Sequence, residues 1–136
     1  MRWKDTYAYL SDGVSINSPG YPEKYPAGQS CSWNLTVPIG FKIKIEPFVH
    51  DIEYPDGMDC SNDYLTFFDG GDKRSEQLAH LCGDDEYAGD ASTGRNLFIA
   101  FESDGGPNDL GGFQFKVSMI GMKRIWILFW HLTWYN

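Results

Sequence analysis

The sequence predicts an all-β domain folded as a sandwich, and three observations lead to this. Aromatic residues make up 16% of the 136 residues, and 15 Gly and 7 Pro are spread along the chain. Aromatics favour pleated, half-buried strands, whereas Gly and Pro end them. Several segments alternate apolar and polar residues, and none has a long helical period. Short strands joined by turns, at intervals of roughly ten to twenty residues, are typical of a sandwich.

Five strands are expected, in residues 31–37, 41–46, 63–69, 97–101 and 113–117. Four of them place apolar side chains at every second position, which puts one face in a core and the other in water. The run 63–69 is apolar on both faces and predicts a central strand. The turn-forming segments SPGYPEKYP, DGGDKRSEQ and SDGGPNDLGG lie between the strands. A single helical turn is expected at 85–89.

Length and charge limit the possible functions. The chain suits one domain, which we place at residues 6–119. Its formal net charge of -8, with eleven scattered Lys and Arg, argues against a nucleic-acid partner. The first ten residues, MRWKDTYAYL, lack the apolar run of a secretory signal, so either the protein is not exported or its true start is missing.

Residues 120–136 differ in character from the rest and are treated as a separate tail. Two basic residues, Lys123 and Arg124, precede an apolar and aromatic stretch at 125–135. This stretch is too short for a transmembrane span, which takes about 20 apolar residues. The tail is therefore an extra strand or packed extension, an interfacial anchor with its basic residues at the headgroups, or a reading-frame extension.

No catalytic motif is present. The chain lacks G-x-S-x-G, H-E-x-x-H, a P-loop and a dinucleotide fingerprint, and His50, His80 and His131 have no motif partners. Paired carboxylates could hydrolyse glycosides, but any acidic sandwich offers such pairs. We therefore expect that the protein is not an enzyme, and a carboxylate-pair hydrolase is the least favoured alternative.

An acidic cluster is the strongest chemical feature of the chain. Seven acidic residues and no basic one lie between Asp51 and Asp72. Their mutual repulsion would raise carboxylate pKa values or open the loop unless a cation sits among them. Ca²⁺ takes six to eight oxygen ligands from carboxylates, carbonyls and water, so it is the natural candidate. From charge alone, a solvated acidic loop remains the alternative.

Eight short motifs give the chain a resemblance to the CUB domain family. The match covers about residues 14–117, with the motifs in the family's order and spacing: SPGYPEKYP, CSW, VPIGFKIKIEPF, DIE, CSNDYLTFFDG, LCG, NLFIAFESD and GGFQFKV. The resemblance implies a two-sheet antiparallel jelly-roll sandwich, usually extracellular, with a disulfide between Cys60 and Cys82. The usual partner of Cys31 would lie near residues 6–7, where this chain has no cysteine, so Cys31 is a small buried hydrophobe, or pairs with an upstream or intermolecular cysteine.

The same resemblance implies a calcium site. Calcium-binding members of the family hold the metal with three carboxylates, which correspond here to Glu53, Asp63 and Asp104. Tyr25 corresponds to a supporting tyrosine, and Gly106 and Asn108 are the candidates to complete the shell. The sequence departs from the family pattern at Asn62 and Pro107. The other acids of the loop, Asp51, Asp56 and Asp59, are expected to be rim charges.

The function implied is an extracellular calcium-binding module for protein recognition, in which metal-organised carboxylates capture a Lys or Arg of a partner protein. The alternative is a stand-alone, spermadhesin-like module that binds carbohydrate or phospholipid head groups without metal. Asn34 begins an N-x-T sequon on an outward strand face, so a glycan is feasible on the secretory route. The sequence gives no prediction of the oligomeric state.

Overall fold

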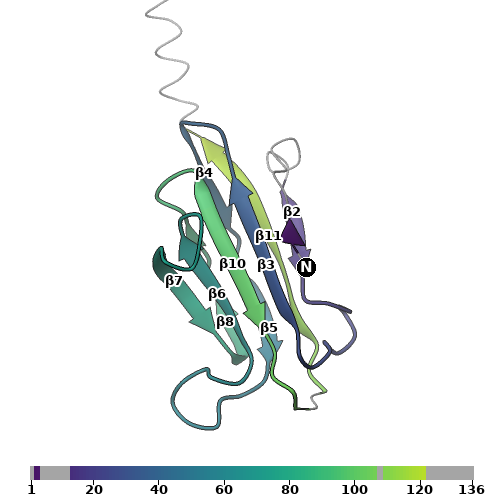
Figure 1. The fold of residues 1–136 in the computed structure, drawn as a ribbon. Coiled ribbons are helices and arrows are strands. Elements are labelled where there is room, and N and C mark those ends of the chain that lie inside the picture. The colour runs from purple at the N-terminus through teal and green to yellow at the C-terminus, as the bar shows by residue number, and fades with distance from the viewer. Residues whose placement is uncertain (1, 4–12, 107–108, 122–136) are drawn as a thin grey trace, which may run out of the picture.

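A computed structural model describes residues 2–3, 13–106 and 109–121, with the backbone alone at residues 2–3. Two sheets pack face to face (Figure 1). The first has five strands in the order β1 (Arg2–Trp3), β3 (Ser30–Thr36), β10 (Asn96–Glu102), β6 (Tyr64–Asp69) and β7 (Glu76–Leu81). The second has six, in the order β8 (Gly83–Tyr87), β5 (Phe48–Ile52), β11 (Gly112–Gly121), β4 (Phe41–Ile45) and β9 (Asp90–Ala91), with β2 (Val14–Asn17) also pairing β11.

The architecture confirms the predicted all-β jelly-roll sandwich. Among the described strand pairs, only β1 and β3 run parallel. All five predicted strands are present, with ends shifted by a few residues, as β3, β4, β6, β10 and β11. The run 63–69 became β6, which lies inside the first sheet between β10 and β7.

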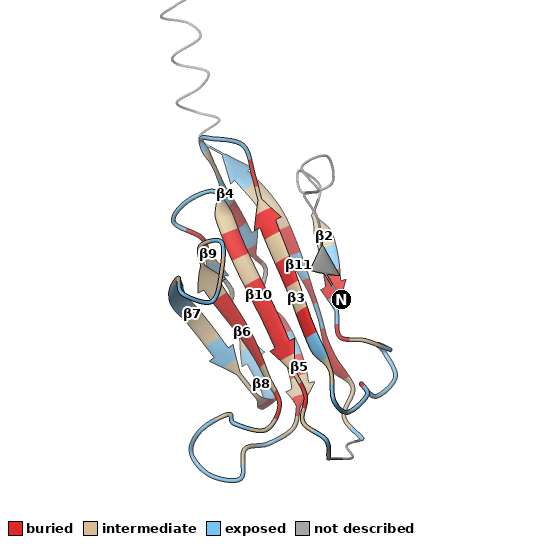
Figure 2. Ribbon diagram, in the orientation of Figure 1, coloured by how far each residue is buried: buried red, intermediate tan, exposed pale blue. Residues whose placement is uncertain are grey.

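The core between the sheets combines aliphatic side chains with a cluster of aromatic rings. Trp33 of β3 and Phe101 of β10 both contact Phe113 of β11, with ring centroids 6.3 and 5.1 Å apart. Phe67 of β6 contacts Phe115 of β11 at 5.2 Å. Each edge-to-face pair adds about 0.5–1.5 kcal/mol beyond its buried area. Buried residues accordingly line the inner faces of β3, β6 and β10 (Figure 2).

The expected helical turn at 85–89 was wrong. Residues Gly83–Tyr87 form β8, which pairs with β5 residue by residue, for example Asp85 with His50. The three exposed acids of β8, Asp84, Asp85 and Glu86, have low strand propensity, but pairing with β5 overrides it. Strands β1, β2, β5, β7 and β9 were also not anticipated.

The predicted tail divides at Gly121. Strand β11 continues through residues 120 and 121, and residues 122–136 lie outside the described part of the chain. In the described residues, no helix has the length and apolar character needed to cross a bilayer.

Candidate metal centre

Three loops meet at one end of the sandwich: residues 18–29, 53–63 and 103–111 (Figure 1). Strands β6 and β10 pair antiparallel with Tyr64 opposite Glu102. The residue before β6 and the residues after β10 therefore emerge side by side, which brings Asp63 to Asp104. Glu53 follows directly after β5 and begins the loop that Asp63 ends.

Glu53, Asp63 and Asp104 form one carboxylate cluster. Each offers one oxygen, and these oxygens all lie within 4.8 Å of one another. Because Ca²⁺–oxygen distances are about 2.3–2.6 Å, two ligands of one ion can be about 5 Å apart at most. The spacing therefore fits a single calcium ion. Asp63 is 1% exposed and lies deepest of the three.

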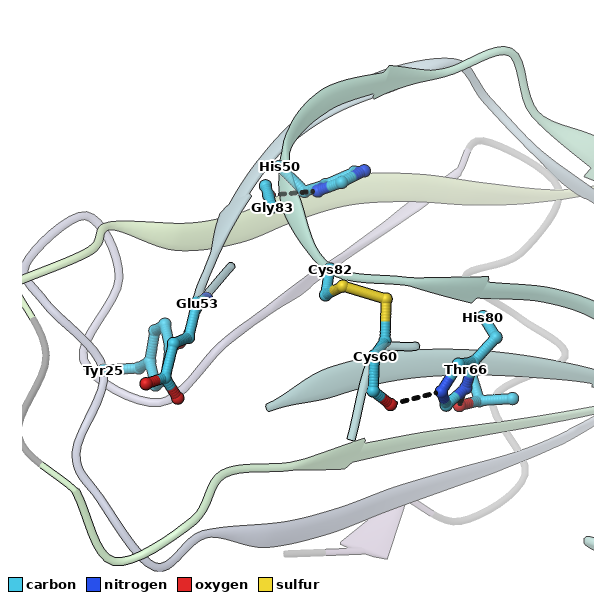
Figure 3. Close-up of a disulfide and its surroundings, with 8 residues drawn as sticks. All are labelled: Tyr25, His50, Glu53, Cys60, Thr66, His80, Cys82 and Gly83. Carbon is cyan, nitrogen blue, oxygen red and sulfur yellow. Dashed lines mark hydrogen bonds between the residues drawn. A yellow bond between two sulfur atoms is a disulfide. The ribbon is translucent and has the colours of Figure 1, made fainter. Parts of the chain in front are cut away.

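Tyr25 ties the cluster together through its hydroxyl. The hydroxyl donates to Asp63 Oδ2 at 2.6 Å and accepts from the backbone N–H of Glu53 at 3.0 Å. The second carboxylate oxygen of Asp63 accepts from the N–H of Asp104 at 2.7 Å. Burial of the ring and the hydrogen bond to Asp63 raise the pKa of Tyr25, so the phenol stays protonated and can donate. Figure 3 shows Tyr25 beside Glu53.

The carboxylate of Glu53 has one buried oxygen, Oε2, that no described residue hydrogen-bonds. Burial, followed by repulsion from Asp63 and Asp104, raises the pKa of Glu53. Leaving a buried charged acceptor unsatisfied is costly. A hard divalent cation would supply the missing partner, so the residues present fit Ca²⁺.

The loop 53–63 is held at its middle as well as at its ends. Cys60 forms a disulfide with Cys82, with their Cα atoms 5.6 Å apart, as the family resemblance implied. Cys82 is the single residue between β7 and β8, where the chain passes from the first sheet to the second. His80 Nε2 donates to the carbonyl of Cys60 at 2.8 Å (Figure 3). The Tyr54 hydroxyl donates to Asp84.

Two of the expected rim charges have structural partners instead. Asp51 Oδ2 accepts from the backbone N–H of Gly111 at 3.0 Å and so supports the loop 103–111. Asp56 Oδ2 accepts from Asn62 Nδ2 at 3.0 Å, so the amide that departs from the family pattern pairs with a neighbouring acid. Nothing in the alternation pattern pointed to the role of Asp51. This contact depends on the pairing of β5 with β11, which places Asp51 opposite Gly112 and next to Gly111.

The remaining proposed shell residues are less fully described. Gly106 donates its N–H to Asp104 Oδ1 at 2.9 Å and therefore lies next to the cluster. Asn108 and Pro107 are outside the described residues.

Cys31 is free and 4% exposed, and burial raises the pKa of its thiol. Asn34 lies on the outer face of β3 and is half-buried.

Comparison with known proteins places these features in a family. The family model for the CUB domain matches residues 6–117. Tolloid-like protein 2 of Mus musculus is 35% identical over 100 residues, covering 74% of this chain. Cubilin of Rattus norvegicus is 36% identical over 100 residues, covering 71%. The chain spans only 10% and 3% of the lengths of these two relatives.

Solved structures share the fold. The crystal structure of the MASP-1 CUB2 domain bound to Ca²⁺ superposes with a TM-score of 0.70 at 24% identity, covering 81% of this chain and 95% of that one. The CUB1-EGF-CUB2 domain of human MASP-1/3 superposes with a TM-score of 0.69 at 27% identity, covering 82% of this chain and 43% of that one.

Proposed function

Because this chain belongs to the CUB domain family, we propose that it is an extracellular module that binds calcium and recognises a protein partner through a Lys or Arg side chain. CUB domains are interaction modules. Where they occur in proteases, they are non-catalytic domains. The observation that carries the proposal is the buried Oε2 of Glu53, which lies beside two further carboxylates and has no hydrogen-bond partner among the residues that the structure describes.

Electrostatics supports the order of binding. Three ionised carboxylates carry a charge of about -3, and one Ca²⁺ would leave about -1. Calcium would supply the positive charge that holds the loops together. The residual negative charge and the free lone pairs of Asp63, Asp104 and Glu53 would then attract one cationic side chain by charge-assisted hydrogen bonds. The MASP-1 CUB2 domain, which has this fold, is bound to Ca²⁺ in its crystal structure.

An oxidising location is supported by the disulfide between Cys60 and Cys82. Disulfides persist in secreted and extracellular proteins and are rare in the cytosol. The spermadhesin-like alternative requires no carboxylate cluster, so the assembled triad favours the calcium-binding function over it.

Calorimetry of the oxidised domain tests the metal. A ligand at 100 times its Kd stabilises the folded state by about 2.7 kcal/mol. For a domain of this size, that corresponds to a rise in Tm of about 8–10 °C between chelator and calcium. Asp104→Ala should abolish the rise, whereas Asp59→Ala, which removes an exposed acid outside the cluster, should preserve it. Superimposed melting curves with calcium and with chelator would refute the metal site.

Retention on lysine-agarose tests the capture of a cationic side chain. A dense lysine surface compensates for a weak single contact through effective concentration. We expect retention in calcium, elution by chelator, and no retention of Asp104→Ala. A domain that binds calcium by calorimetry but is never retained would keep the metal site and refute the recognition mechanism.

A further inference from the structure

The outer face of the first sheet carries a row of three residues from three adjacent strands. Asn34 of β3 lies directly opposite Phe98 of β10, and Phe98 lies directly opposite Phe68 of β6. The two phenylalanine rings have centroids 6.1 Å apart at 55°. All three side chains are half-buried and therefore partly open to solvent. We call Phe68 and Phe98 the aromatic platform.

A hollow of about 420 Å³ lies beside the platform. Its floor includes Thr66 and Ala100, which are 3% and 2% exposed although they face outward. The small side chain of Ala100, two residues beyond Phe98 on β10, leaves this space between larger neighbours. The side chains around it combine aromatic rings with hydrogen-bonding groups: Tyr64, Phe68, Lys73, Gln77 and His80. Aromatic faces beside polar groups suit a sugar, which has apolar C–H faces and hydroxyl edges.

The Asn34 amide is not engaged in a hydrogen bond within the described chain. Its Oδ1 atom is buried and has no hydrogen-bond partner among the described residues. Its Nδ2 atom is not buried and makes no hydrogen bond within the described chain. Nδ2 is the atom that accepts a glycan in an Asn-x-Thr sequon, and the chain reads Asn34-Leu35-Thr36.

We propose that Asn34 carries an N-linked glycan whose first sugars lie on the aromatic platform and extend toward the hollow. The donor is a polyprenyl-diphosphate-linked oligosaccharide. Nδ2 forms a bond to C1 of its first N-acetylglucosamine, the C1–oxygen bond to the diphosphate breaks with its electron pair, and the Nδ2 proton is lost. The platform is within reach of this sugar because Phe98 is the cross-strand neighbour of Asn34.

This arrangement would leave the carboxylate cluster open. Asn34 lies within β3, whereas Glu53, Asp63 and Asp104 lie in loops at one end of the sandwich. The glycan would cover the solvent-accessible part of the half-buried aromatic platform.

Secretion from a eukaryotic host tests the attachment. Intact-mass measurement should find one glycan on the wild-type chain and on Thr36→Ser, which keeps the sequon and the hydroxyl, and none on Asn34→Gln. A wild-type chain secreted without a glycan would overturn the proposal and leave the calcium site unaffected.

Two measurements test the contact with the platform. The glycosylated wild-type should melt about 3 °C above Asn34→Gln, and this difference should disappear when both chains also carry Phe98→Ser. Peptide-N-glycosidase should release the glycan from the native wild-type several-fold more slowly than from Phe98→Ser or Phe68→Ser. Equal release rates, or a melting difference that survives Phe98→Ser, would show that the glycan projects freely into solvent and would overturn the contact.

Discussion

Tyr25→Phe removes one oxygen from the centre of the carboxylate cluster and leaves the packing of the ring unchanged. The ring of Tyr25 is 1% exposed and packs edge-to-face on Phe101 at 5.1 Å. The lost hydroxyl donates to a charged acceptor, Asp63 Oδ2, and accepts from the N–H of Glu53. In the variant, Asp63 Oδ2 would lose this donor and the N–H of Glu53 would lose this acceptor, and phenylalanine replaces neither.

The expected loss of stability follows from these two bonds. A hydrogen bond to a charged group contributes about 1.5–3 kcal/mol and a neutral one about 0.5–1.5 kcal/mol, so the free energy of unfolding should fall by about 2–4 kcal/mol. With a urea m-value of about 2 kcal/mol/M, the unfolding midpoint should fall by about 1–2 M.

Urea unfolding in chelator, followed by tryptophan fluorescence, measures this change. Tyr21→Phe is the matched control, because Tyr21 lies in the same loop, is 37% exposed, and makes no side-chain hydrogen bond among the described residues. It should change the midpoint little, since exposed substitutions usually stay within about 0.5 kcal/mol. If Tyr25→Phe behaves like Tyr21→Phe, the hydroxyl does not organise the cluster and the reasoning fails.

Three further predictions concern charge, backbone and thiol. The folded-state pKa of Glu53 is raised above its ordinary value of 4.5, because the folded state favours the protonated carboxyl. The contribution of this protonated group to the free energy of unfolding is fully present below pH 4.5 and is lost as the pH rises through the raised pKa. The calcium-induced rise in Tm should therefore grow with pH above 4.5, and a constant rise would contradict this. Gly40 and Gly112 both have a positive φ, of 92° and 82°. A Cβ added at Gly40 would meet open space, whereas a Cβ added at Gly112 would lie 2.9 Å from Ser18 Cβ. Gly40→Ala should cost about 1–2 kcal/mol and Gly112→Ala on the order of 3–5 kcal/mol by denaturant unfolding, and equal costs would show that the contact is relieved. Thiol titration should detect none in the native protein and one, Cys31, after unfolding without reductant, whereas three would show that the disulfide is absent.

For strands β3, β11 and β8, predictability followed the burial of one face. Strands β3 and β11 have one fully apolar face, and the alternation of Trp33 and Leu35, or of Phe113 and Phe115, with polar residues was enough to place them. Strand β8 has no such face, because its centre is exposed and acidic. Only its pairing with β5, more than thirty residues earlier, makes it a strand. That pairing leaves no local pattern.

The carboxylate cluster depended on the family resemblance for the same reason. Asp63 and Asp104 are brought together by the register of β6 and β10, which no local spacing encodes. Tyr25 comes from a third loop, and its pairing with Asp63 was also implied only by the family pattern. Asp51 was assigned to the rim because its partner is a backbone N–H of Gly111, and backbone donors carry no residue-type signature.

The length and position of β11 have a mechanical consequence. This ten-residue strand begins at Gly112, beside the loops of the carboxylate cluster, and ends at Gly121. At about 3.3 Å per residue, its ends are about 30 Å apart. A pull between a partner held at those loops and an attachment beyond Gly121 would run along β11, so its hydrogen bonds to β2 and β4 would be loaded together in shear instead of one after another. The domain should therefore resist force along this axis.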